Sequence, residues 1–131
     1  MKTEDLEQKI KRTKQLDMNL IKQNQPPSFG EHIQAMLNEQ GIRKTALIKA
    51  MNVDRNYGYQ ILNGIRKPTR MQVIRIALFL ALDLTQTQRL LNIAGREALY
   101  VRRPEDAKTV YCLEHKMPFS KACEYIWGTS Q

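Results

Sequence analysis

Apolar residues recur at helical spacing along most of the chain, and capping residues separate the runs. The first clear run lies between Ser28, which forms an S-x-x-E capping box with Glu31, and Gly41, which suits a helix end. Its apolar face has the spacing i, i+4, i+7 and i+8 and is made by Phe29, Ile33, Met36 and Leu37. The pattern therefore predicts an amphipathic helix between Ser28 and Gly41.

Further helices are predicted along the rest of the chain. Two short ones cover residues 44–51 and 55–62, and a T-x-x-Q capping box at Thr69 opens a longer one that runs to Leu82. This longer helix is apolar on most sides, which is typical of a buried helix. We therefore expect it to form the centre of the core, with Met71 and Phe79 both inside.

The last third of the sequence continues the helical pattern. The same cap signal at Thr85 opens a helix that Gly95 closes. After an irregular connection, helices are expected at residues 104–115 and 119–127, the first with a proline at its first position. Strand signals are weak beside this pattern, so the sequence predicts an all-α protein.

Positive charge is concentrated in one part of the chain. The formal net charge is +8, and residues 41–82 hold eight Lys or Arg against one acid, Asp54, which gives +7 in that window alone. Such a local block indicates a site for a polyanion. The alternative is a basic face that contacts only solvent.

The two short helices and the three-residue turn between them lie inside this basic window. Such a pair can place its second helix in the major groove of DNA. Arginine can bond guanine bidentately, while asparagine and glutamine can pair with adenine. The predicted base-reading residues are Arg55, Asn56, Tyr57 and Gln60. The predicted phosphate-binding residues are Lys44, Thr45, Tyr59, Asn63, Gly64, Arg66, Lys67 and Arg70.

Other roles for some of these residues stay open at this point. Arg55 could pair with Asp54 or Glu39 instead of DNA, and Tyr59 could belong to the core. The same holds for Arg75, which could extend from the core helix to solvent instead of meeting phosphate.

Residues 47–69 resemble the helix-turn-helix domain of the Cro and phage-repressor type, the Xre family. The resemblance rests on the Asn-Gly and Arg-Lys-Pro-Thr run after the second helix. Residues 54–95 are also similar to Xre-like proteins of Gram-positive bacteria in the pattern Asp-Arg-x-Tyr-Gly-Tyr-Gln and the ending Leu-Leu-x-x-Ala-Gly. The resemblance implies a five-helix repressor-like bundle, sequence-specific DNA binding, dimers, and transcriptional regulation, more typically repression than activation.

The chain departs from the family pattern at three places. Arg43 and Lys44 replace the usual Ser or Thr cap and the Gln that follows it, so a lysine–phosphate contact is expected there. Asn52 stands where a glycine is common, and asparagine tolerates positive φ. Gly58 replaces a β-branched core residue, which predicts a tight crossing of the two short helices or a close DNA backbone.

The expected organisation has three parts. Residues 1–27 form a partly helical extension that the Gln25-Pro26-Pro27 stretch ends. This extension is a docking helix, a dimer contact or an arm. Residues 28–95 form the helix-turn-helix domain. Residues 96–131 form helices that either pack on the domain or make a dimer contact.

Other chemistry receives little support from the sequence. Cys112 and Cys123 are expected to be packing residues, since their spacing with His115 matches no common zinc pattern. His32 lies on a different predicted helix, and no nucleophile, acid pair or glycine-rich phosphate loop is recognisable. We therefore expect no enzyme activity, no metal and no cofactor.

The expected partner is double-stranded DNA, bound by a homodimer. The alternative function is a protein-interaction module, such as an antitoxin or an adaptor, that uses the extension and the last helices. Because no apolar run is long enough to cross a bilayer and no secretory signal is present, the expected location is the cytoplasm without a membrane contact.

Overall fold

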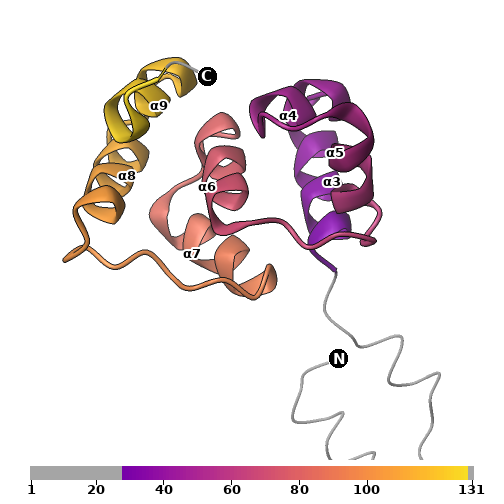
Figure 1. Cartoon of the computed structure of the whole chain (residues 1–131), viewed down its shortest axis with the longest axis horizontal. Coiled ribbons are helices and arrows are strands. Elements are labelled where there is room, and N and C mark those ends of the chain that lie inside the picture. The colour runs from indigo at the N-terminus through magenta and orange to yellow at the C-terminus, as the bar shows by residue number, and fades with distance from the viewer. Residues whose placement is uncertain (1–27, 130–131) are drawn as a thin grey trace, which may run out of the picture.

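The computed structural model describes residues 28–129 and is all-helical over that range (Figure 1). Within these residues it contains seven helices and no strand. The helices are α3 (Phe29–Gln40), α4 (Lys44–Ala50), α5 (Arg55–Leu62), α6 (Arg70–Phe79), α7 (Leu84–Ile93), α8 (Pro104–Glu114) and α9 (Phe119–Trp127). The predicted extension over residues 1–27 lies outside the described residues. No helix in the described part is both long and apolar enough to cross a membrane.

Helix α6 forms the centre of the molecule, as its apolar pattern predicted. It contacts α4 on one side and α7, α8 and α9 on the others, and it lies between these groups in Figure 1. Six consecutive residues, 73–78, are buried. The helix ends three residues earlier than predicted, and Ala81 just beyond it has a φ of 53°. Met71 is not in the core, since it is half exposed in the first turn.

The start of α7 corrects one prediction. The N-cap is Asp83 and not Thr85, because the Asp83 carboxylate accepts a hydrogen bond from the Gln86 amide at 2.7 Å and the Gln86 side chain accepts one from the Asp83 amide. Thr87 instead points inward, and its hydroxyl donates to the Asp83 carbonyl. Because Asp83 caps the helix and Thr87 is buried one turn later, α7 starts two residues earlier than predicted.

Two expectations about the α4–α5 turn are confirmed. Asn52 has a φ of 58°, as predicted for a residue in place of glycine. A Cβ on Gly58 would lie within 3.0 Å of the Ile48 side chain, so the two helices cross closely there. A second close approach was not expected: a Cβ on Gly30 would overlap the backbone carbonyl of Leu62, which places α3 directly against α5. These approaches fix where α5 lies.

Helices α8 and α9 pack on α6. Cys112 and Cys123 are both buried there, and burial raises the pKa of each thiol. Their packing agrees with the expectation from sequence, and among the described residues no group of three His, Cys, Asp or Glu gathers in a way that fits a metal. The connection before α8 is held by the Gln88 side chain, which bonds both the amide and the carbonyl of Leu99.

Candidate nucleic-acid interface

Helix α5 presents one polar side, and Asp54 sets its start. The Asp54 carboxylate caps the helix by accepting hydrogen bonds from the Asn56 and Tyr57 amides at 3.2 and 3.3 Å. The side of the helix that holds Gly58 and Ile61 is buried. The cap and the apolar side together leave the opposite side of α5 available for a partner.

The predicted base-reading residues lie on that available side to different degrees. Each residue turns the helix by about 100°, so Arg55, Asn56 and Gln60 follow one another around one continuous arc. Arg55 and Asn56 are exposed, whereas Gln60 is partly buried. Tyr57 and Tyr59 are also partly buried and pack against the core, so both tyrosines combine a core contact with a reachable edge.

Arg66 is held against α5 from the loop that follows it. Its Nε donates to the Gln60 Oε1 at 3.0 Å, and its guanidinium lies 4.5 Å from the centre of the Tyr57 ring. The backbone amides of Ile65 and Arg66 both donate to the Gln60 carbonyl. The loop thus folds back over the end of α5. It brings Arg66, which was predicted to bind phosphate, into contact with Gln60 and Tyr57, which were predicted to read bases.

Helix α4 adds exposed polar and basic side chains, two of which lie near Arg55 of α5. Lys44 and Thr45 are exposed at its first positions. Thr45 and Lys49 line a shallow hollow of about 320 Å³ whose other residues include Arg55 of α5. Sequence reasoning did not include Lys49 in the site. Its place four residues after Thr45, on the same helix face, was the available signal.

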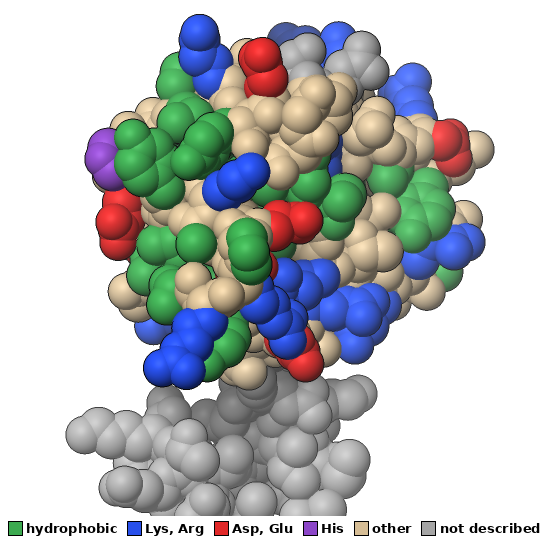
Figure 2. All heavy atoms as spheres, turned by 60° about the vertical axis from the view of Figure 1, so that its left-hand side comes forward, with side chains coloured by type: hydrophobic (Ala, Val, Ile, Leu, Met, Phe, Trp, Pro, Cys, Tyr) green, Lys and Arg blue, Asp and Glu red, His purple; other side chains and the backbone are tan. Residues whose placement is uncertain are grey.

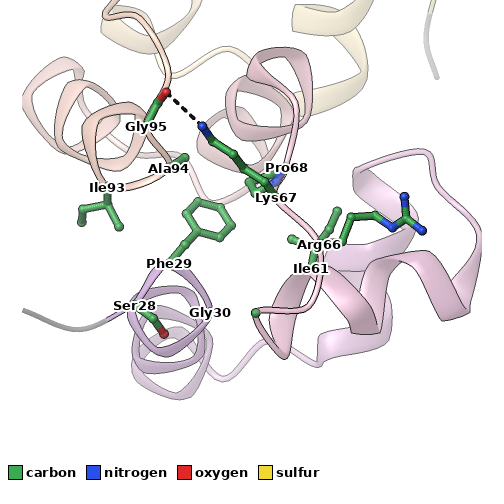
Figure 3. Close-up of a pocket in the computed structure, with 11 residues that line it drawn as sticks. Ser28, Phe29, Gly30, Ile61, Arg66, Lys67, Pro68, Ile93, Ala94 and Gly95 are labelled. Atoms are coloured by element: carbon green, nitrogen blue, oxygen red, sulfur yellow. Dashed lines mark hydrogen bonds between the residues drawn. The ribbon is translucent and has the colours of Figure 1, made fainter.

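In the loop after α5, the side chains of Arg66 and Lys67 point in different directions (Figure 3). Asn63 ends α5, and Gly64 has a φ of 78°, which turns the chain away. Lys67 extends across a pocket of about 420 Å³ to the carbonyl of Gly95, at 3.4 Å, while Arg66 points away from that pocket. The sequence did not indicate that Lys67 has a partner within the chain.

Arg70 contacts the C-terminal part of the chain rather than the exposed side of α5. Its guanidinium donates to both carboxylate oxygens of Asp106, at 3.0 and 2.8 Å, and to the carbonyls of Glu97 and Ala98. Burial by itself raises the pKa of the Asp106 carboxyl. The hydrogen bonds from Arg70 and the Tyr100 amide outweigh that effect and hold this pKa below its usual value. We therefore leave Arg70 out of the candidate interface.

Arg75 also has contacts inside the protein. It is 4% exposed, its Nε donates to the Ala50 carbonyl at 2.7 Å, and its guanidinium lies near the rings of Phe119 and Trp127. The sequence left two alternatives for this side chain, an extension to solvent or a contact with phosphate. The structure supports neither, because the side chain is buried.

Polar and basic residues of α4, α5 and the loop after α5 that are exposed, together with the partly buried Gln60, form the surface that we call the α4–α5 surface. Its members are Lys44, Thr45, Lys49, Arg55, Asn56, Gln60, Asn63 and Arg66. Within the described residues none of its lysines or arginines makes an ion pair.

Comparisons with protein-family models, with curated proteins and with solved structures each gave no match. The resemblance to the Xre family therefore stands on the residues that carry it. The geometry of the α4–α5 surface is the independent ground on which a function can be proposed.

Proposed function

We propose that this protein binds double-stranded DNA in a sequence-specific manner, with α5 in the major groove, and thereby regulates transcription. The observation that carries the proposal is the composition of the α4–α5 surface. Side chains suited to base edges lie along one arc of α5, exposed cations flank them, and the single acid, Asp54, is used as the helix cap. A surface with this composition suits a polyanion whose grooves carry a donor and acceptor code.

The base-reading part of the proposal assigns a partner to each side chain. Arg55 suits the two acceptors of guanine, and Asn56 suits the donor and acceptor edge of adenine. Gln60 keeps the same capacity, because the bond from Arg66 uses one of two lone pairs on its amide oxygen. Tyr57, which is partly buried, offers a ring edge to a thymine methyl.

The phosphate-binding part uses residues on both sides of α5. Lys49 on α4 lines the same hollow as Arg55 at one end of the reading arc, and Arg66 bonds Gln60 at the other end. Lys44 is exposed at the start of α4. Such contacts fix the position of a protein on the duplex, while base contacts give the sequence preference. The other phosphate candidates in the proposal are Thr45, Tyr59, Asn63, Gly64 and Lys67.

The fold assignment belongs to the same proposal. Helices α3 to α7 supply the five helices of a repressor-like bundle, with α4 and α5 as its helix-turn-helix pair. The close crossing at Gly58 and the positive φ of Asn52 support this pairing, because both allow a short turn between two tightly packed helices.

The test begins with selection of a binding sequence from a random duplex library by the full chain. Affinity for the selected and for scrambled DNA is then measured at several salt concentrations by fluorescence anisotropy. We expect the Arg55→Ala, Asn56→Ala variant to bind the selected sequence no better than scrambled DNA. The matched control is Asn92→Ala, Arg102→Ala, which removes the same residue types from exposed positions outside the surface and is expected to behave as wild type.

Two outcomes would count against the proposal. If affinity does not fall with salt, no phosphates are being neutralised, since each one contributes a slope of about −0.9 in a log–log plot. If selection enriches no sequence and both variants bind alike, the basic residues are a general polyanion surface.

A second candidate function is binding of a partner protein, as an antitoxin or an adaptor does. Exposed aromatic side chains on α8 and α9 favour it. Retention of all cellular activity by the Arg55→Ala, Asn56→Ala variant would support this second function alone.

A further inference from the structure

A pocket of about 500 Å³ lies where α4, α6 and α9 meet. Helices α4 and α9 lie at the same end of the molecule, on either side of α6 (Figure 1). One face of α4 contributes Ala46, Lys49 and Ala50 to the pocket, the last residue of α6 contributes Phe79, and the first residue of α9 contributes Phe119. Sites for small molecules in proteins have volumes of about 300–1,000 Å³, so this pocket is large enough for such a ligand.

Aromatic rings form one wall of the pocket. Phe79 and Phe119 meet edge to face, with ring centroids 5.6 Å apart and an angle of 84° between the rings. Both side chains are only partly buried, so each keeps a surface that a ligand can reach. Arg75 holds this wall to α4, since its Nε donates to the Ala50 carbonyl and its guanidinium lies 5.3 Å from the centre of the Phe119 ring. The wall is therefore formed before any ligand arrives.

The charge of the pocket has one sign. Lys49 and Arg75 are both cationic, and Asn52 adds an amide, while none of the described residues that line the pocket is acidic. Lys49 is exposed and makes no ion pair within the described residues. On the outer side of the molecule that carries α8 and α9, in contrast, hydrophobic side chains lie among charges of both signs (Figure 2). The pocket thus combines an apolar wall with cations alone, which suits an organic anion.

We propose that this pocket binds a small aromatic carboxylate, whose ring lies against Phe79 and Phe119 and whose carboxylate faces Lys49 and Asn52. A flat ring fits this wall because aromatic rings favour edge-to-face and offset contacts with one another. Lys49 also lines the hollow beside Arg55, so one lysine borders both the pocket and the α4–α5 surface. If the proposed function holds, on which this clause alone rests, the bound carboxylate weakens DNA binding by neutralising Lys49.

The first test uses 2-naphthoate as the probe and the full chain without DNA, so it does not depend on the proposed function. Binding is followed by two-dimensional ¹⁵N NMR, in which the amides that shift locate the ligand. We expect the largest shifts at the residues that line the pocket and a dissociation constant of about 1 mM or lower, as is usual for a ligand of this size. Absence of binding, or shifts centred on another part of the chain, would overturn the proposal.

Two variants test the site itself. Ala46→Trp fills the pocket from an exposed position and should weaken binding about tenfold or more, whereas Ala98→Trp, at an exposed alanine outside the pocket, should bind as wild type. Lys49→Gln should weaken binding about twofold to fivefold, as expected for an exposed ion pair. Lys44→Gln is its control, because Lys44 lies on the same helix but does not line the pocket. Unchanged binding by Ala46→Trp contradicts the location of the site.

The uncharged analogue 2-naphthamide tests the charge of the ligand. It keeps the ring system, so its binding to wild type should be weaker than that of 2-naphthoate by the same factor as the Lys49→Gln substitution causes. Lys49→Gln should bind the two compounds about equally, since the cation that separates them is gone. If wild type binds the amide as tightly as the carboxylate, the pocket takes a neutral apolar ligand and the assignment of an anion is wrong.

The last test adds the selected DNA duplex. Saturating 2-naphthoate should lower the DNA affinity of wild type about fivefold, the lower end of the usual coupling between two sites, and should leave Ala46→Trp unchanged. Sodium acetate at the same concentration is the control for ionic strength. DNA affinity that does not respond, in a chain whose pocket binds 2-naphthoate, would overturn the coupling. A chain that binds 2-naphthoate but no DNA would overturn the proposed function and support the pocket.

Discussion

The α4–α5 side and the α8–α9 side of the molecule flank the same buried helix, α6, yet they expose different chemistry. The first carries lysines, arginines and amides around a short helix, with one acid used as a cap. The second exposes tyrosines, and over residues 104–127 it exposes equal numbers of lysines and glutamates. The excess positive charge of this protein is therefore concentrated on the α4–α5 side. The two sides suit different classes of partner for that reason.

The two sides are also built differently. Helix α5 packs closely against its neighbours at two glycines. Gly30 of α3 lies against the Leu62 backbone, and Gly58 of α5 lies against the Ile48 side chain. Helix α8 also buries apolar residues, but its start is tied to the first turn of α6 by the pairing of Arg70 with Asp106. Substitutions can therefore act on one side and leave the other intact.

The largest effect on stability is expected for Arg70→Ala. Asp106 is 1% exposed, and without Arg70 its carboxylate would be a buried charge with no hydrogen-bonded cation. Loss of one partner of a buried pair costs about 3–5 kcal/mol, and we expect the lower end because the Arg70 side chain is 24% exposed to water. Urea unfolding of wild type and variant measures this loss. The control is Arg102→Ala, an exposed arginine with no such contact.

A pH series separates the pairing from a simple loss of packing. Because the Asp106 pKa is lowered in the folded chain, its stabilisation is fully present above about pH 4, the usual pKa of an unfolded aspartate. It is lost as the pH falls from there through the folded pKa. This part of the acid dependence should disappear in Asp106→Asn. If Arg70→Ala weakens DNA binding but not stability, Arg70 belongs to the α4–α5 side, as its sequence position had suggested.

An intermediate effect is expected for Gly58→Val, which breaks the α4–α5 side alone. The added side chain would overlap that of Ile48, and overpacking of this kind costs about 1–3 kcal/mol. Thermal unfolding followed by circular dichroism measures the change. Asn56→Val provides the comparison at an exposed position of the same helix, where only helix propensity is lost. Equal losses in the two variants would mean that the crossing is not tight.

The smallest effects are expected at Asp54, and they sharpen the charge difference between the two sides. Asp54→Ala removes the cap of α5 and should cost about 1 kcal/mol of stability. Asp54→Asn keeps a capping oxygen but removes the negative charge, so stability should hold while DNA affinity at low salt rises about twofold. Unfolding curves and DNA titrations of both variants give the two readouts. An Asp54→Asn variant with weakened DNA binding would show that this carboxylate has a role beyond capping.

Local signals in the sequence predicted most of the helices. Caps at Ser28, Asp54 and Thr69 and the left-handed Gly41 all act within a few residues, so they are visible in the sequence. The start of α7 was predicted wrongly because Asp83 and Thr85 both fit a cap, and the burial of Thr87 decides between them. That burial is a tertiary property which a capping pattern does not contain.

Long-range contacts explain the differences at the candidate site. Arg70 and Asp106 are 36 residues apart, so an arginine beside a basic loop was taken for a phosphate ligand. Lys67 and Gly95 are similarly separated. Gly58, in contrast, was interpreted correctly, because a glycine inside a short helix is unusual enough to indicate a close neighbour. Residues that act through their immediate neighbours are therefore the ones that the sequence predicts well.

The position of Arg66 has a consequence for the entropy of binding. A free arginine side chain samples many rotamers, and restricting them costs up to about 2 kcal/mol. Here the bond to Gln60 and the contact with the Tyr57 ring already restrict these rotamers before any partner arrives. Since part of the ordering takes place when the chain folds, less of it opposes association. Gln60→Ala should therefore weaken any contact that Arg66 makes, because it would return to Arg66 the conformational freedom that binding must then remove.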